Sequence, residues 1–293
     1  MIWPKVTIIF PNFNGGQNPL ECLSSIKKLN YPQNRLEIII VDNNSQDGSP
    51  VKIKKEFPKT IILCQKRNLG FAKAVNLAAK KAVGKFLFIT NDDITFEKES
   101  LINLVEYTIN HTKTGIVGGK QINPKTGKFL AGGRKFNFLT GRQSPVKSNK
   151  PVECDQVDGC CILTSKEIFN KVGLFDEGFF PAYGEDLDFC LKVKKANYKV
   201  IYNPQAIFYH KFGQTVSKFP LTDMYYFGFK NKLRLILKHA NFFQITAFLF
   251  TNYFLTVPAR IVIKREPILI PEIKALVWNI KNLKKTLMVR EEK

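Results

Sequence analysis

Short apolar runs alternate with helix-length amphipathic runs along the first 120 residues of the chain. The strand-like runs are Val6–Phe10, Leu36–Val41, Ile61–Leu63 and Phe86–Thr90. Helical patterns begin at Pro19, Pro50 and Ala72, and Asn18 and Ser49 are the expected N-caps of the first two. Alternation of this kind with short connections predicts an α/β fold built on a parallel, doubly wound sheet.

The pattern weakens from Gly115 to Lys150, where Gly and Lys are frequent, and this segment is predicted to form hairpins or a mobile flap. A strand is then expected over Gln156–Thr164, followed by a short helix that Ser165 caps and Gly173 stops. The remaining expected elements are a helix over Glu185–Ala196, strands over Tyr198–Tyr202 and Ile207–His210, and a helix over Thr222–Lys238.

The last part of the chain is apolar and basic. Residues 239–259 carry no formal charge when His239 is neutral, and their number could span a bilayer, but polar residues such as Asn252 dilute the stretch. A second apolar stretch, Pro267–Ile280, and a basic tail follow. Apolar stretches between Lys and Arg are typical of helices that lie in a lipid headgroup layer, and an ordinary helical subdomain or an oligomer interface is the alternative. We therefore expect a main domain over residues 1–219 and a helical, membrane-associated segment over residues 220–293.

Charge and cysteine content indicate which partners and which cellular compartment the protein has. The net charge is +21, and from Lys192 to the end 19 Lys and Arg stand against 5 Asp and Glu. Such an excess indicates an anionic partner, which could be nucleic acid, an anionic membrane surface or a phosphorylated substrate. The six cysteines form no C-x-x-C pair, which disfavours a zinc site or a disulfide scaffold. Because the N-terminus has no signal-peptide pattern, we expect a cytoplasmic protein, peripheral or monotopic at the inner face of the cell membrane.

Polar clusters follow three of the predicted strands. Asn12 and Asn14 follow the first strand, Asp42 the second, and Asp92 and Asp93 the fourth. Open α/β sheets bind ligands at the carboxyl ends of their strands, so these clusters are expected to converge on one crevice.

Four sequence blocks, in order, resemble the family 2 glycosyltransferases of the GT-A fold, especially their rhamnosyltransferase-like branch. The blocks are V-T-I-I-F-P-N-F-N (Val6–Asn14), I-I-I-V-D-N-N-S-Q-D-G-S (Ile38–Ser49), R-N-L-G-F-A-K-A-V-N (Arg67–Asn76) running on to F-L-F-I-T-N-D-D (Phe86–Asp93), and G-L-F-D-E-G-F-F-P-A-Y-G-E-D-L-D-F-C (Gly173–Cys190). Each block is weak alone, but the ordered set is specific. The resemblance implies a Rossmann-like, mostly parallel nucleotide-diphospho-sugar transferase fold and an inverting glycosyltransferase (hexosyltransferase) that uses a UDP- or dTDP-sugar.

The resemblance also implies a donor-binding set. The carboxylate of Asp42 would accept a hydrogen bond from the ring N–H of uracil or thymine, since a carboxylate only accepts and so selects a donor edge. The other residues of this set are Pro11, Asn12, Asn14, Asn44, Arg67, Asn68, Gly70 and Asp92. An N-cap or Asx-turn role for Asp42, turn roles for the asparagines and a solvated Arg67 are the alternatives.

The segment Asn91-Asp92-Asp93 matches the position of the family's D-x-D motif, with Asn in place of the first Asp. The resemblance implies that Asp93 holds Mg²⁺ or Mn²⁺, which neutralises the diphosphate as the sugar bond breaks. Some similar proteins place a His against the metal or diphosphate where His210 stands, and a purely structural His is the alternative.

Glu185 and Asp186 resemble the family's E-D motif at the start of a helix. Asp186 is the expected general base, because an acceptor hydroxyl becomes a good nucleophile only as it loses its proton. Glu185 belongs to the same catalytic pair, although acidic residues also favour helix N-termini through the helix dipole. Asp158 and Gly159 are expected on the acceptor side.

Other classes of protein fit less well. A nucleic-acid-binding protein would need basic residues interleaved with aromatics on a known module, and no such module is found, so no nucleic-acid partner is expected. A sugar nucleotidyltransferase would need a basic, Gly-rich loop after the first strand, and a dehydrogenase would need G-x-G-x-x-G there. A basic nucleic-acid- or membrane-binding α/β protein without transferase activity is the remaining alternative. The acceptor is expected to be a saccharide or a lipid-linked saccharide, and only the branch likeness suggests rhamnose as the donor sugar.

Overall fold

The computed structural model describes residues 2–211 and 220–291, and these fall into two compact units. The first unit contains described residues 2–135, 145–181 and 185–211, and the second contains 136–144, 182–184 and 220–291. The boundary predicted between residues 219 and 220 adjoins residues 212–219, which lie outside the described residues.

The strands belong mainly to one large sheet. They are β1 (Val6–Asn12), β2 (Leu36–Asp42), β3 (Ile61–Cys64), β4 (Phe86–Thr90), β5 (Ile94–Phe96), β6 (Thr114–Ile122), β7 (Phe129–Ala131), β8 (Arg134–Asn137), β9 (Arg142–Pro145), β10 (Val152–Glu153), β11 (Cys161–Ser165) and β12 (Lys199–His210). The helices of the first unit are α1 (Asn18–Lys27), η1 (Gln33–Arg35), α2 (Ser49–Glu56), α3 (Gly70–Lys81), α4 (Ser100–Asn110), α5 (Lys166–Lys171), η2 (Glu177–Phe179) and α6 (Glu185–Lys195).

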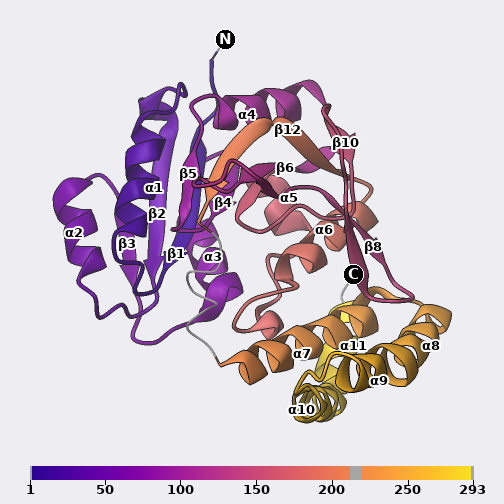
Figure 1. Ribbon diagram of the computed structural model, residues 1–293. Coiled ribbons are helices and arrows are strands. Elements are labelled where there is room, and N and C mark those ends of the chain that lie inside the picture. The colour runs from indigo at the N-terminus through magenta and orange to yellow at the C-terminus, as the bar shows by residue number, and fades with distance from the viewer. Residues whose placement is uncertain (1, 212–219, 292–293) are drawn as a thin grey trace. The chain divides into compact units, whose positions relative to one another are not determined.

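Eight strands of the ten-stranded sheet run in the order β10-β12-β6-β11-β4-β1-β2-β3, and the other two, β5 and β7, pair with β12 and β6. Most of these strands are labelled in Figure 1. Strands β3, β2, β1 and β4 are mutually parallel, as the alternating sequence pattern predicts, and β12 is parallel to β6. The prediction of a mostly parallel sheet is confirmed, and β11 is an antiparallel exception that lies between β4 and β6. No described helix intervenes between β6 and β11, so the chain returns to the sheet without a helical crossover.

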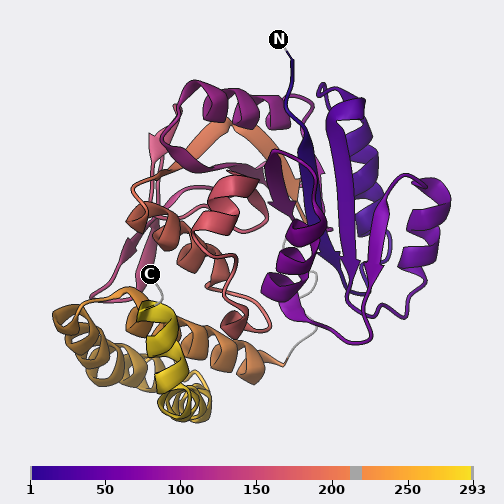
Figure 2. The same cartoon turned by 180° about the vertical axis from the view of Figure 1, so that it is seen from behind.

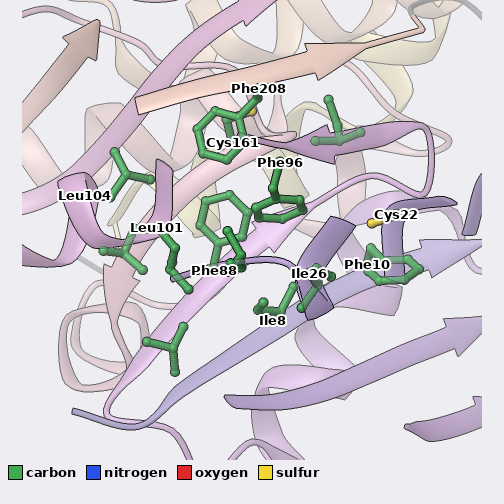
Figure 3. Close-up of a cluster of buried hydrophobic side chains, with 14 of the residues drawn as sticks. Ile8, Phe10, Cys22, Ile26, Phe88, Phe96, Leu101, Leu104, Cys161 and Phe208 are labelled. Carbon is green, nitrogen blue, oxygen red and sulfur yellow. The ribbon is translucent and has the colours of Figure 1, made fainter. Parts of the chain in front are cut away.

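Both faces of the sheet are covered, so successive residues of the central strands serve different cores. On one face, Ile8 and Phe10 of β1 pack with Phe88 and with α1 and α4 (Figure 3). On the other face, Ile9 packs with α3, α5 and α6. The period of two along a strand thus explains why the strands read as continuous apolar runs. Figure 2 shows the same layers from behind.

Local details correct several sequence-based expectations. Residue Gln17 rather than Asn18 is the N-cap of α1, and Gly48 rather than Ser49 precedes α2, where Ser49 Oγ donates to Asp47 instead. Ser165 does cap α5 by accepting from Ile168 N. The two strands expected after α6 are one strand, β12, with an irregularity between Asn203 and Ile207. The segment expected to form hairpins or a flap contains paired strands: β6 pairs antiparallel with β7, and β8 pairs with β9. The hairpin alternative is therefore confirmed, whereas the length of β6 within the main sheet was not predicted.

The second unit is helical. Its helices are α7 (Leu221–His239), α8 (Phe242–Phe250), the π-helix η4 (Thr251–Thr256), α9 (Val257–Val262), α10 (Leu269–Lys281) and α11 (Leu283–Glu291). Helix α7 is its centre: Phe229 packs with Val257 and Ile268, and Ile236 packs with Phe248. Among the described residues, Phe242–Val262 is one helical stretch that is long and apolar enough to span a membrane. Of an 18-residue part of this stretch, 17% is buried.

Candidate active site

Two of the predicted polar clusters meet because β1 and β2 are in register, with Asn12 opposite Asp42. Asn12 Nδ2 donates to Asp42 Oδ1 at 2.8 Å and lies 2.9 Å from Ser49 Oγ. The other carboxylate oxygen of Asp42 accepts from Ser45 N at 3.0 Å, which is the turn-type contact left open as an alternative. A carboxylate offers about four acceptor positions, so Asp42 retains capacity for a ligand N–H.

The loops after these strands are tied to each other. Asn14 has a positive φ of 50°, and its Oδ1 accepts from Gln46 N at 2.7 Å. Asn44, also with positive φ, is exposed beside them, and Pro11 is partly buried within β1. These residues therefore shape the backbone turns at the strand ends and do not form a set of side chains that point inward.

Asp92, which belongs to the third polar cluster, approaches Asn12 of the first cluster at Gly15. A Cβ on Gly15 would lie 2.4 Å from Asp92 Oδ2 and 2.5 Å from Asn12 Oδ1. Only a residue without a side chain fits between these two oxygens, so Gly15 allows the ends of β1 and β4 to converge. The convergence inferred from the strand-end pattern is therefore visible in the geometry.

The loop before α3 approaches the same strand ends. Asn43 Oδ1, after β2, accepts from Leu69 N at 3.2 Å, and Asn68 Oδ1 accepts from Gly70 N at 2.8 Å. Gly70 has a φ of +75°, and a Cβ there would lie 2.8 Å from the carbonyl oxygen of Pro181. Arg67 is exposed. The structure thus gives Asn68 and Gly70 definite positioning roles and leaves Arg67 on the surface.

Asp93 and His210 come together because β5 pairs with β12, with Ile94 opposite His210. Asp93 Oδ1 lies 3.3 Å from His210 Nε2, and both side chains are 7% exposed. The other ring nitrogen, Nδ1, lies 2.7 Å from Gln121 Oε1. Burial lowers the pKa of His210, but its contacts with Asp93 and Cys160 outweigh that effect and raise the pKa to about 10.

These two side chains suit a divalent cation. At a pKa of about 10 the metal-free ring carries a proton on both nitrogens, and the Nε2 proton lies toward Asp93 Oδ1. A divalent cation could take the place of that proton while Nδ1 keeps its own proton toward Gln121. Two facing acceptors need a proton or a cation between them. Residues 2–211 and 220–291 hold no cluster of three or more His, Cys, Asp and Glu side chains suited to a metal. A cation here would therefore take its remaining ligands from diphosphate oxygens and water, as Mg²⁺ usually does.

Asp186 and Glu185 differ in environment although they are adjacent. Asp186 is partly exposed, and it accepts from Leu187 N at 2.7 Å, Gln156 Nε2 at 3.0 Å and Gly159 N at 3.2 Å. Glu185 is buried, and burial followed by the charge of Asp186 raises the pKa of Glu185 well above its usual range. Of the predicted pair, Asp186 is placed to meet a substrate and Glu185 faces the interior.

Sequence reasoning missed three polar residues of this region. Gln156 holds Asp186, Gln121 contacts His210, and Arg134 pairs with Asp158 at 3.1 Å. None of the three lies in a motif, and each is brought in by a strand or loop from the Gly- and Lys-rich segment or its continuation. The expected acceptor-side residue Gly159 reaches the site through its backbone N–H.

The comparisons with known proteins agree with this picture. The model of the family "Glycosyl transferase family 2" matches residues 7–173. An uncharacterized glycosyltransferase of Rickettsia bellii is 30% identical over 191 residues, which are 64% of this chain and 27% of the relative. The N-acetylglucosaminyl-diphospho-decaprenol L-rhamnosyltransferase of Mycobacterium tuberculosis is 24% identical over 60% of this chain and 67% of its own length. The chain thus spans about a quarter of the first relative and about two thirds of the second.

Solved structures share the fold at low identity. GalNAc-T7 with UDP, GalNAc and Mn²⁺ superposes with a TM-score of 0.69 at 15% identity, over 85% of this chain and 50% of that one. Residues 1–349 of S. aureus TarS with UDP-GlcNAc give a TM-score of 0.63 at 19% identity, over 93% and 79% of the two chains.

Together, the curled, mostly parallel sheet and its strand-end polar residues define a glycosyltransferase of the GT-A fold, as the sequence blocks predict. The chain belongs to glycosyl transferase family 2.

Proposed function

We propose that this protein transfers a sugar from a UDP- or dTDP-linked donor to a hydroxyl group of a saccharide or lipid-linked acceptor, with inversion at the anomeric carbon. The observation that carries the proposal is the buried pair of Asp93 Oδ1 and His210 Nε2, 3.3 Å apart, at the same sheet edge as Asp42 and Asp92. This edge combines the means to hold the diphosphate through a cation and the base through a carboxylate, and both groups are parts of a nucleotide-sugar.

The donor would lie across the ends of β1, β2 and β4. Asp42 would accept from the ring N–H of the pyrimidine, and Asp92 would bind ribose or sugar hydroxyls. Asn12, Asn14, Asn68 and Gly70 would shape the pocket around them. The UDP bound to GalNAc-T7 and the UDP-GlcNAc bound to TarS support a uridine donor. A dTDP-sugar is the other candidate because thymine offers Asp42 the same ring N–H as uracil.

Asp93 and His210 would hold Mg²⁺ or Mn²⁺, and the Mn²⁺ in the GalNAc-T7 structure supports this assignment. Such a cation supplies positive charge that stabilises the departing diphosphate. The protein's own part is to hold the two ligand atoms at a fixed separation before the donor arrives.

Asp186 would act as general base. As the acceptor oxygen attacks the anomeric carbon from the side opposite the diphosphate, Asp186 takes the hydroxyl proton. One carbon–oxygen bond forms, the bond to the diphosphate oxygen breaks, and the nucleoside diphosphate leaves with that electron pair. The three N–H groups around Asp186 fix its carboxylate while leaving it partly exposed for this contact.

We assign the transfer chemistry to residues 1–219 and membrane association at the cytosolic face to residues 220–293. The mycobacterial relative's name includes a polyprenyl-linked acceptor, which supports an acceptor held in a membrane. Segments 136–144 and 182–184 belong to the second unit, where Asn231 Nδ2 donates to the carbonyl oxygens of Ala182 and Tyr183 at 2.8 Å. Because a deletion of residues 220–293 would remove these contacts, variants of single residues are better probes of this unit.

Two substitutions separate binding from chemistry. Asp186→Asn should lower kcat at least 100-fold while the affinity for UDP with Mn²⁺ changes by no more than a few fold. Asp93→Ala should instead remove the metal-dependent part of UDP binding. Glu153→Gln, at an exposed acid that pairs with Lys199, is the matched control and should change neither quantity. Equal loss of affinity and turnover in Asp186→Asn would exclude its role as the base, and unchanged metal-dependent binding in Asp93→Ala would remove Asp93 from the metal site.

A further inference from the structure

The helical stretch Phe242–Val262 turns an apolar face away from its own unit. Phe243, Phe250, Phe254 and Val262 are 56–74% exposed, and their spacings of seven, four and eight residues place them along one side of the stretch. Soluble proteins rarely expose contiguous apolar surface of this kind without a partner.

The opposite side of the same stretch is fastened inside the unit. Phe248 and Val257 are buried against α7 residues, and Asn252 Nδ2 donates to Glu272 Oε1 of α10 at 2.8 Å. Thr251 Oγ1 also donates to the carbonyl oxygen of Leu139 at 2.7 Å. The polar and packed side faces the protein, and the apolar side faces out.

Helix α10 repeats the arrangement. Ile270, Ile273, Val277 and Ile280 are 43–66% exposed and follow each other at intervals of three and four residues. Exposed basic residues accompany the two apolar faces. They are Lys264, Arg265, Lys274, Lys281, Lys284 and Lys285.

We infer that these two apolar faces lie within the interfacial layer of one leaflet of an anionic bilayer, and that Phe242–Val262 does not cross it. This inference rests on the membrane association proposed above and decides its mode. A crossing orientation would carry the Asn252–Glu272 pair to the bilayer centre and strip Phe248 and Val257 from their packing, whereas a flat orientation preserves every contact. The basic residues match anionic headgroups and would repel a second copy of the same surface.

A depth profile tests this mode. Spin labels are attached to the full chain through Phe243→Cys, Phe250→Cys, Phe254→Cys or Val262→Cys, each in a Cys64→Ser background because Cys64 is the exposed cysteine among the described residues. Vesicles contain phosphatidylcholine and phosphatidylglycerol. All four labels should lie at one depth, about 5–10 Å below the headgroups, and a label at Ile109→Cys on exposed α4 should stay in water.

Other outcomes overturn the inference in distinguishable ways. A depth that reaches the bilayer centre at positions 250 and 254 and returns to the surface at 243 and 262 would establish a crossing helix and leave membrane association intact. Four labels in water would reject both the mode and the association. Shielding of the labels without vesicles, together with a doubled mass, would assign the surface to a second copy of the chain.

A separate observation concerns Gln121, which is 1% exposed and which no motif identifies. Its Nε2 donates to Asp158 Oδ2 at 2.9 Å, and Arg134 contacts both oxygens of that carboxylate, at 3.1 and 3.2 Å. Because a carboxylate only accepts, this contact fixes the amide orientation and turns Gln121 Oε1 toward His210 Nδ1 at 2.7 Å. When a cation takes the place of the Nε2 proton, His210 keeps its proton on Nδ1 and presents the lone pair of Nε2 to the cation beside Asp93.

We propose that Gln121 is a positioning residue that selects the metal-binding tautomer of His210, with Asp158 and Arg134 fixing Gln121 in turn. This rests on the proposed metal site. Partners of this kind behind a ligating His usually change metal affinity about 10- to 100-fold when removed. Gln121→Met, which keeps the length but loses the acceptor, should weaken Mn²⁺ binding in the presence of UDP by that factor. Gln121→Glu, which retains an acceptor oxygen, should lose less.

The test measures free Mn²⁺ by electron paramagnetic resonance, with Gln205→Met at an exposed Gln as control. The chain has three His residues, so the ¹⁵N shifts of His210 are readily assigned in the Mg²⁺–UDP complex and report its tautomer directly. Circular dichroism checks that each variant is folded. Unchanged Mn²⁺ affinity and tautomer in folded Gln121→Met would overturn the role of Gln121 alone. Absence of Mn²⁺ binding to the unmodified protein would overturn the proposed metal site as well.

Discussion

Gly70 offers a quantitative test of how closely the loop before α3 approaches the chain around Pro181. Its φ is +75°, and a Cβ there would lie 2.8 Å from the Pro181 carbonyl oxygen and 2.9 Å from the Phe180 ring. Gly48 has the same φ of +75°, but a Cβ there would meet nothing within 4 Å. The two glycines therefore share the backbone cost of a side chain and differ in the space for it.

The magnitudes follow from this difference. A left-handed conformation costs Ala about 1–2 kcal/mol, offset by about 0.4–1 kcal/mol from the less flexible unfolded chain. Gly48→Ala should therefore lower the free energy of unfolding by about 1.6 kcal/mol at most. Gly70→Ala adds overpacking against a backbone oxygen that also accepts from Phe71 N at 3.0 Å, at a further cost of about 1–3 kcal/mol.

Urea unfolding measures the difference. The chain has two tryptophans, so Trp278→Phe leaves Trp3, whose ring centroid lies 5.3 Å from that of Tyr31, as the reporter for the first unit. In this background, Gly70→Ala should unfold at a lower urea concentration than Gly48→Ala, with an unchanged slope. Equal stabilities of the two variants would refute the reasoning, because the close approach of the Pro181 carbonyl would then carry no cost.

Two further predictions concern single positions at the strand ends. Gly15→Ala places a methyl group within 2.5 Å of Asp92 Oδ2 and Asn12 Oδ1, so UDP affinity measured by calorimetry should fall at least 10-fold, and an unchanged affinity would remove Asp92 from the donor site. Burial raises the pKa of Asp158 from 3.8 to about 6, because it outweighs the opposite effect of the Arg134 charge. Ionisation of Asp158 therefore destabilises the folded state, by up to about 3 kcal/mol above pH 6, and this cost disappears below about pH 4. Asp158→Asn should therefore raise the melting temperature relative to the unmodified protein more at pH 7.5 than at pH 4.5, and a difference independent of pH would contradict the assigned shift.

Sequence patterning predicts the N-terminal half of the sheet well, because β1, β2 and β4 are largely buried parallel strands, the edge strand β3 is short and apolar, and each of the four follows or precedes a helix. It misses β6, which reads as part of a flap because Gly115, Gly118 and Gly119 interrupt its pattern. The structure gives the reason for all three glycines: a Cβ would lie 2.4 Å from Val193 on Gly115, 2.5 Å from Val157 on Gly118 and 2.3 Å from Phe208 on Gly119. Close packing of neighbouring segments, invisible in a single sequence, requires them.

The candidate site likewise contains residues that the sequence predicts and residues that it does not. Asn12, Asp42 and Asp92 are found from the sequence because strand ends in a parallel sheet share one edge. The partners of the catalytic and metal-site candidates are not found, since Gln156 and Gln121 reach Asp186 and His210 only through long-range contacts. Glu185 is buried and Asp186 is partly exposed, and the two adjacent acids at the start of a helix do not reveal this difference in the sequence.

The central claim is a metal-dependent pyrimidine-diphosphate site, and calorimetric titration of UDP, dTDP, GDP and ADP tests it most directly. Each nucleotide is titrated into the full chain with Mn²⁺ and again with a chelator. The account predicts that UDP or dTDP binds only with Mn²⁺ and that GDP and ADP bind at least about 10-fold more weakly. Adenine in a nucleotide has no ring N–H for Asp42, and the larger guanine presents its ring N–H farther from the ribose than a pyrimidine does. Binding of none of the four, or equal binding of all of them without metal, would contradict the account.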